Sequence, residues 1–133
     1  MDKKYYEVEN VIGKTKSEAK NGLIFCCQRG PKGECAFKWE FPGGKVETGE
    51  TDEEALIREI KEELKGTIKV DKYLLTVEHE YNTFKIKMKV YKCTLFDELI
   101  LSEHIDCKWL AKDQLQEIDF AEADKKIVNY IIK

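Results

Sequence analysis

Apolar and polar residues alternate regularly along residues 83–95 of this chain. The apolar positions are Phe84, Ile86, Met88 and Val90, and lysines separate them. A period of two is typical of a β-strand that buries one face. Residues 23–28 are apolar on both faces, which predicts a strand buried on both sides. The pattern predicts further strands over residues 5–12, 39–41, 68–80 and 108–110.

A helical period begins near Thr51. Leu56, Ile60 and Leu64 recur every four residues and so share one helix face. Thr51 followed by Glu54 predicts a capping box at the start of this helix. Helical patterns also cover residues 112–118 and 123–132, whereas Pro42-Gly43-Gly44 predicts a turn. Strands, a helix, more strands and a terminal helix predict an α+β fold, in which helices cover two faces of a mixed sheet.

Length and composition limit the function further. The 133 residues predict one domain over residues 1–133, and the net charge of -3 argues against binding to a nucleic-acid polymer. The five cysteines are odd in number and lack C-x-x-C spacing, which argues against a disulfide framework and a zinc site. No apolar run approaches membrane-spanning length. We therefore expect a cytoplasmic protein with no membrane partner.

Acidic residues gather on another face of the helix that follows Thr51. Glu59, Glu62 and Glu63 lie three and four residues apart, so a helix brings them to one side. Mg²⁺ takes oxygen ligands and is commonly shared between carboxylates and substrate phosphates. The cluster predicts a Mg²⁺ site, for which Mn²⁺ is a possible substitute. The alternative, a solvated helix face, leaves the spacing of the neighbouring glycines unexplained.

Residues 44–66 resemble the Nudix box, G-x5-E-x7-R-E-U-x-E-E-x-G-U, where U is a bulky apolar residue. The matching residues are Gly44, Glu50, Arg58, Glu59, Ile60, Glu62 and Glu63. Lys65 stands where the motif has its second glycine, and Gly66 follows it. This departure predicts a helix that runs one residue further before it stops.

The resemblance extends to MutT-type Nudix hydrolases over residues 8–132. Residues 39–45 are similar to the W-E-F-P-G-G-K run of these enzymes. Two further stretches also resemble this subgroup: Glu103-His104 before Trp109, and residues 120–124 before the last helix. It implies the Nudix fold, an α/β/α sandwich around a mixed sheet. It also implies hydrolysis of a nucleoside triphosphate to the monophosphate and pyrophosphate, for which divalent cations neutralise phosphate charge.

The resemblance implies a metal and catalytic set. The implied metal ligands are Glu59, Glu62, Glu63, Glu103 and the Gly43 carbonyl, and the implied catalytic residues are Glu62, Glu63, Glu103 and Arg58. Glu103, on a loop, is expected to act as a ligand or as the general base. Arg58 is expected to tie the loop of residues 47–50 to the helix, rather than to contact substrate.

The resemblance also implies the substrate-binding residues Arg29, Lys38, Phe120 and Asp124. Arg29 matches a position that reaches the phosphate chain, although it is equally interpreted as an ordinary strand-end arginine. Phe120 is expected to contribute to a wall that stacks on the base. Asp124 is expected to bind the base edge, or else to cap the last helix. Trp39 and Trp109 are expected to pack, and neither His79 nor His104 is assigned to a metal.

The substrate and assembly stay open at this level. Oxidised purine triphosphates and cytidine triphosphates are both compatible with an Asp at position 124, because a carboxyl group accepts when ionised and donates when protonated. A regulatory Nudix-fold domain that binds a nucleotide without cleaving it is an alternative, as is a hydrolase of another nucleoside diphosphate derivative. Both a monomer and a homodimer are compatible with the sequence.

Overall fold

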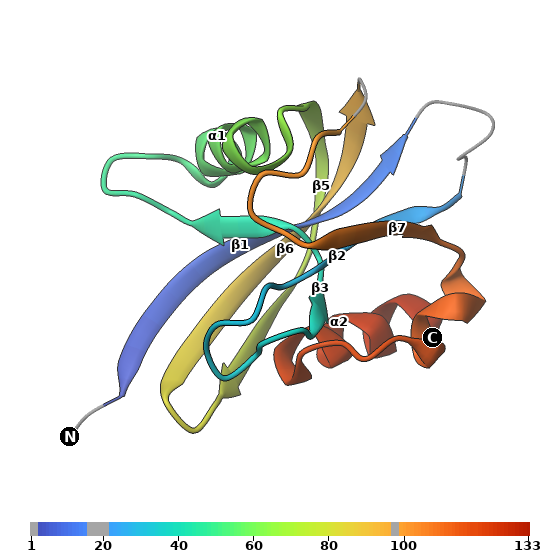
Figure 1. Ribbon diagram of the computed structural model, residues 1–133. Helices are drawn as coiled ribbons and strands as arrows, with labels where there is room; N and C mark the ends of the chain where they lie inside the picture. The colour runs from blue at the N-terminus through green and yellow to red at the C-terminus, as the bar shows by residue number, and fades with distance from the viewer. Residues whose placement is uncertain (1–2, 16–21, 97–98) are drawn as a thin grey trace.

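The strands of this protein form two sheets in the computed structural model, which describes residues 3–15, 22–96 and 99–133 (Figure 1). The four-stranded sheet has the order β4-β1-β6-β5, and the three-stranded sheet has the order β3-β2-β7. The strands of the first are β4 (Gly43–Lys45), β1 (Lys4–Thr15), β6 (Phe84–Phe96) and β5 (Thr67–Glu80). Those of the second are β3 (Trp39–Glu40), β2 (Ile24–Gln28) and β7 (Asp106–Leu110).

The four-stranded sheet is mixed, as predicted. Strand β1 runs parallel to β6 and antiparallel to β4, and β6 runs antiparallel to β5. Val8 therefore pairs with Met88 on one side and with Lys45 on the other. The predicted turn at residues 42–44 is wrong in part, because Gly43 and Gly44 belong to β4 and pair with β1.

Helix α1 (Asp52–Leu64) begins at the predicted capping box. The Thr51 hydroxyl accepts from the Glu54 N–H at 3.2 Å, and the Glu54 carboxylate accepts from the Thr51 N–H at 3.0 Å. The predicted extension at the other end is wrong, because the helix stops at Leu64 and Lys65 itself takes the left-handed conformation, with φ of 56°. That conformation costs a non-glycine residue about 1 kcal/mol. The Lys65 ammonium donates to the Glu62 carbonyl at 3.1 Å.

Gly66 lies where the chain passes close to the side chain of Leu99. A Cβ atom at this position would overlap the side chain of Leu99, so the chain packs closely as it leaves α1. Two properties that a single glycine often provides at a helix end are thus found at two successive residues. Lys65 supplies the backbone conformation, and Gly66 supplies the close approach.

The helices lie on opposite sides of the sheets, with α1 on one side and α2 (Glu122–Ile132) on the other (Figure 1). Strand β2 lies between these layers, because Cys27 belongs to the cluster that packs with α1 and Cys26 to the cluster that packs with α2. The predicted burial of both faces of this strand is confirmed. A 3₁₀ helix, η2 (Lys112–Glu117), precedes α2. Within the described ranges, no helix is long and apolar enough to cross a membrane.

Candidate active site

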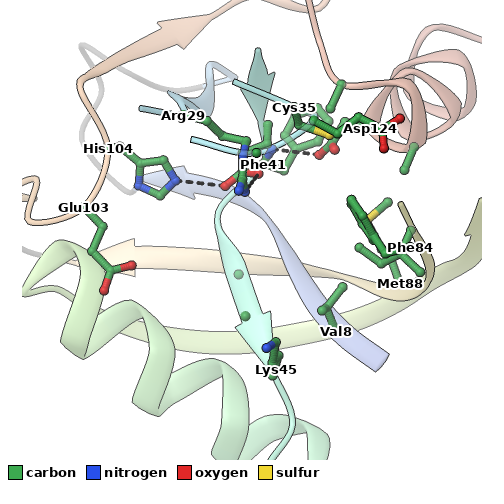
Figure 2. Close-up of a pocket in the computed structure, with 18 of the residues that line it drawn as sticks. Val8, Arg29, Cys35, Phe41, Lys45, Phe84, Met88, Glu103, His104 and Asp124 are labelled. Atoms are coloured by element: carbon green, nitrogen blue, oxygen red, sulfur yellow. Dashed lines mark hydrogen bonds and ion pairs between the residues drawn. The ribbon is translucent and has the colours of Figure 1, made fainter. Parts of the chain in front are cut away.

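A cavity of about 1170 Å³ is lined by segments that lie far apart in the sequence (Figure 2). Glu103, on the loop before β7, and Asp124 of α2 lie at opposite ends of it (Figure 2). Glu59 and Glu63 of α1 belong to the Glu103 end, because the charges of Glu59 and Glu103 both act on Glu63. Apolar side chains of β1 and β6 form a wall of this cavity. They are Val8, Phe84, Ile86 and Met88. The cavity therefore offers a charged end, an apolar surface and a buried polar group.

Glu59 of α1 lies against the glycine strand β4. A Cβ atom at Gly44 would overlap the Glu59 side chain, so this carboxylate reaches its place only because residue 44 is glycine. The Arg58 guanidinium donates to Glu59 Oε1 at 2.8 Å and holds it there. Gly43 lies in the same cavity wall, next to Gly44.

Glu63, one turn further along α1, is a buried carboxyl group with an unsatisfied oxygen. It is 9% exposed, and its Oε2 atom has no hydrogen-bond partner among the described residues. Burial, followed by the charges of Glu59, Glu103 and Glu40, raises the pKa of Glu63 to about 9. A divalent cation would favour the ionised carboxylate and occupy the free oxygen, so these residues fit Mg²⁺.

The acidic end is not a complete metal cage. Within the described part of the chain, no three His, Cys, Asp or Glu side chains converge closely enough to enclose an ion. Mg²⁺ commonly keeps waters and takes one or two carboxylates together with substrate phosphates. The pair of Glu59 and Glu63 fits that incomplete kind of site.

Arg58 links the loop before α1 to the helix, as the sequence predicts. Its Nε and Nη2 atoms donate to both oxygens of Glu50 at 2.7 and 2.9 Å, and Nη2 also donates to the Lys45 carbonyl at 2.9 Å. Glu62 contacts the same guanidinium at 3.3 Å. Glu62 is 59% exposed, and the structure places it outside the cavity lining.

Glu40 and His104 were not predicted as site residues, yet both line the cavity. The Glu40 carboxylate contacts His104 Nε2 at 2.9 Å and accepts from Arg29 Nη1 at 3.0 Å (Figure 2). Burial raises the pKa of Glu40, but His104 and Arg29 outweigh it and hold that pKa below its ordinary value. The group is therefore ionised, and Nε2 is the donor in the contact with His104.

Asp124 lies deep in the other end of the cavity. It is 4% exposed, and its Oδ1 atom accepts from the Phe41 N–H at 3.0 Å. The capping interpretation is wrong, because Ala121 is the N-cap of α2 and Asp124 lies within the first helical turn. Burial, followed by the Glu40 charge, raises the pKa of Asp124 well above its ordinary value. A neutral Asp124 can both donate and accept a hydrogen bond.

The structure does not bring the other two predicted substrate-binding residues into the cavity. Lys38 is ion-paired with Asp119 at 2.8 Å on the surface. Phe120 is 1% exposed and stacks against Phe41 with ring centroids 5.1 Å apart, so it belongs to the core behind the cavity wall. Arg29 and Glu103 do line the cavity.

Comparisons with known proteins point to one family. Residues 18–130 match the family model of the NUDIX domain. An 8-oxo-dGTP diphosphatase from Proteus vulgaris is 33% identical over 89 residues, which cover 67% of this chain and 80% of that protein. A CTP pyrophosphohydrolase from Escherichia coli K12 is 30% identical over 106 residues, which cover 79% of this chain and 78% of that protein.

A solved structure extends the likeness over almost the whole chain. It is the solution structure of the DNA mismatch repair protein MutT, of the Nudix hydrolase family, from methicillin-resistant Staphylococcus aureus 252. It has a TM-score of 0.72 and 40% sequence identity, and the match covers 98% of each chain. This chain belongs to the Nudix hydrolase family and is an enzyme of the MutT type.

Proposed function

We propose that this enzyme hydrolyses a nucleoside triphosphate to the monophosphate and pyrophosphate, with Mg²⁺ as its cofactor and Mn²⁺ as a substitute. One observation carries the proposal. A single cavity has carboxylates at one end, an apolar wall, and a buried hydrogen-bonding group, Asp124, at the other end. This order matches a nucleotide, in which a charged phosphate chain and a flat polar-edged base are separated by a sugar. The names of the two curated relatives support the same reaction class.

At the acidic end, Glu59, Glu63 and the Gly43 carbonyl would hold the metal. Bound Mg²⁺ supplies charge neutralisation for the phosphates and makes water a better nucleophile at neutral pH. Glu103 lines the same end and would accept the proton of the attacking water or complete the ligand set. Arg58 keeps Glu59 in place through its 2.8 Å contact.

Arg29 would bind the phosphate chain. One of its guanidinium nitrogens contacts Glu40 at 3.0 Å, and its side chain is 43% exposed. A guanidinium has five N–H donors, so the contact with Glu40 leaves others for phosphate oxygens. The contact with Glu40 would also orient Arg29 before the substrate arrives.

At the base end, Asp124 would read the edge of the base while the apolar wall covers its face. Burial favours the protonated form of Asp124, which donates as well as accepts a hydrogen bond and would suit a base edge that presents an oxygen beside an N–H group. Oxidised purine triphosphates and cytidine triphosphates are the two substrate classes that we propose to test first.

A kinetic panel with matched binding measurements tests this proposal. Purified enzyme with Mg²⁺ is expected to release pyrophosphate from one or more of 8-oxo-dGTP, dGTP, CTP and dCTP, with kcat/KM separating them. Tight nucleotide binding by calorimetry without turnover on any of them would indicate a regulatory domain. Turnover restricted to nucleoside diphosphate derivatives would indicate a different hydrolase.

A further inference from the structure

The residues just before Glu103 hydrogen-bond to the C-terminal end of α1. Ser102 donates twice to the Glu63 carbonyl, from its N–H at 3.1 Å and from its hydroxyl at 2.8 Å. The same hydroxyl lies 3.0 Å from the Glu62 carbonyl oxygen. The Ile100 N–H donates to the Leu64 carbonyl at 2.7 Å. The residue before Glu103 is thus bound to the main chain of Glu63, the buried carboxyl of the acidic end.

The residues just after Glu103 hydrogen-bond to β3 and β2. His104 Nε2 donates to Glu40 at 2.9 Å, and the Ile105 N–H donates to the Gln28 carbonyl at 3.0 Å. The His104 side chain is 5% exposed, and its Nδ1 atom has no hydrogen-bond partner among the described residues. The contribution of the ring is therefore its packing and its single bond to Glu40, which Arg29 holds from the other oxygen.

Glu103 lies between these two anchors and projects into the cavity (Figure 2). A carboxylate on a loop fixed at one side only can swing, whereas fixation at both neighbouring residues restricts its main chain. We infer that Ser102 and His104 are positioning residues, which together hold the Glu103 carboxylate at a set place relative to Glu63. This inference rests on the proposed function, in which Glu103 acts on the metal or the attacking water.

The competing explanation is purely structural. The last carbonyls of a helix lack partners within the helix, and Ser102 satisfies two of them, so its loss could act only by fraying α1. A positioning role makes a distinct demand, because its effect must pass through the Glu103 carboxylate. A displacement of about 1 Å in a reacting group can cost on the order of 10²-fold in rate, so the effect is large enough to measure.

A double-mutant cycle with Glu103→Gln separates the two explanations. Ser102→Ala and His104→Ala are each expected to lower kcat about tenfold or more with little change in KM. In the Glu103→Gln background, the same changes are expected to lower kcat by less than about twofold. Ser102→Thr and His104→Gln keep the donors and are expected to restore most of the rate. Thr94→Ala, which removes a 2.7 Å hydroxyl contact with Asp71 away from the cavity, is the matched control.

The same set of variants is also compared without nucleotide in two measurements. Electron paramagnetic resonance gives their Mn²⁺ affinity, and hydrogen exchange gives the amide exchange rates of residues 99–105. Ser102→Ala is expected to speed exchange in this loop and to weaken Mn²⁺ binding only when Glu103 is present. Equal losses of rate and affinity in both backgrounds would overturn the positioning role. Coupling in Mn²⁺ affinity, in an enzyme that releases no pyrophosphate, would instead uphold the positioning role while the proposed reaction fails.

Discussion

Asp124 and Phe41 join α2 to the chain segment that enters the acidic end of the cavity. The carboxyl oxygen of Asp124 accepts from the Phe41 N–H at 3.0 Å, although the two residues are 83 positions apart. Phe41 immediately precedes Pro42 and strand β4, whose glycines accommodate Glu59. One buried hydrogen bond therefore fixes the base end of the cavity relative to its phosphate end.

Asp124→Asn is expected to stabilise the protein increasingly as pH rises. Burial and the Glu40 charge raise the folded-state pKa of Asp124 above its unfolded value. Stability from the protonated group is thus complete below the unfolded pKa, near 3.8, and is lost as pH rises towards the folded pKa. Asparagine does not titrate and keeps an oxygen for the Phe41 N–H. Urea unfolding should therefore show a difference in unfolding free energy between variant and wild type that widens as pH rises from about 4 to 8.

The comparison between variant and wild type cancels the other titrating groups. Near pH 4 the two unfolding free energies are expected to converge. A gap that stays constant from about pH 4 to pH 8 would mean that Asp124 ionises normally in the folded protein.

Asp124→Asn is also expected to change which nucleotide the enzyme prefers. The substitution replaces a carboxyl group by an amide, which presents different donors and acceptors to a base edge. A mismatched buried pair typically costs a few kcal/mol, so kcat/KM should be reordered among 8-oxo-dGTP, dGTP, CTP and dCTP. An unchanged ranking would move base recognition from Asp124 to other residues of the cavity.

Arg58→Lys is expected to lower both stability and rate. A lysine cannot reproduce the two contacts with Glu50 together with the contacts to Glu59 and the Lys45 carbonyl. The loss of these charge-assisted bonds should cost about 1–3 kcal/mol in chemical unfolding. Lys61→Ala on an exposed face of the same helix is the control. Equal losses of stability and rate in the two variants would show that the Arg58 contacts do not hold the loop and Glu59 in place.

Glu63→Gln and Glu62→Gln are expected to differ. Glu63 is buried in the cavity, whereas Glu62 is 59% exposed and lies outside its lining. Glu63→Gln should lower kcat by on the order of 10²-fold or more while the melting temperature without metal does not fall. The loss for Glu62→Gln should be smaller. Steady-state kinetics at saturating Mg²⁺ measure both, with the exposed Glu53→Gln as control, and a larger loss for Glu62→Gln would reverse the assignment.

The parts of this fold that the sequence predicts are those with local signals. The capping box at Thr51 and Glu54 and the alternation along β6 follow from residues within a few positions of each other. Strand β4 lacks such a signal, because Gly43 and Gly44 have no side chains to alternate and its pairing with β1 defines it. The conformation of Lys65 was equally hidden, since non-glycine residues rarely become left-handed.

In the candidate site too, the sequence predicts what depends on local spacing and misses what depends on tertiary contacts. Helical spacing brought Glu59 and Glu63 together, because it is a local property. The contact between Glu40 and His104 joins residues 64 positions apart. Both residues lie in stretches that resemble MutT-type enzymes, but neither stretch indicates that the two side chains meet. The resemblance to MutT-type enzymes implies that Phe120 contributes to a wall that stacks on the base. The packing of Phe41 over Phe120, which excludes Phe120 from the cavity, is a tertiary feature.

The central claim is metal-dependent release of pyrophosphate from a nucleoside triphosphate at the Glu59 and Glu63 end of the cavity. Phosphorus NMR of the products, recorded with each nucleotide of the panel in Mg²⁺ and again in excess EDTA, tests it most directly. Equal amounts of nucleoside monophosphate and pyrophosphate are expected with Mg²⁺, no products in EDTA, and recovery when Mn²⁺ is added. Undiminished turnover in EDTA, or release of orthophosphate with the nucleoside diphosphate, would contradict it.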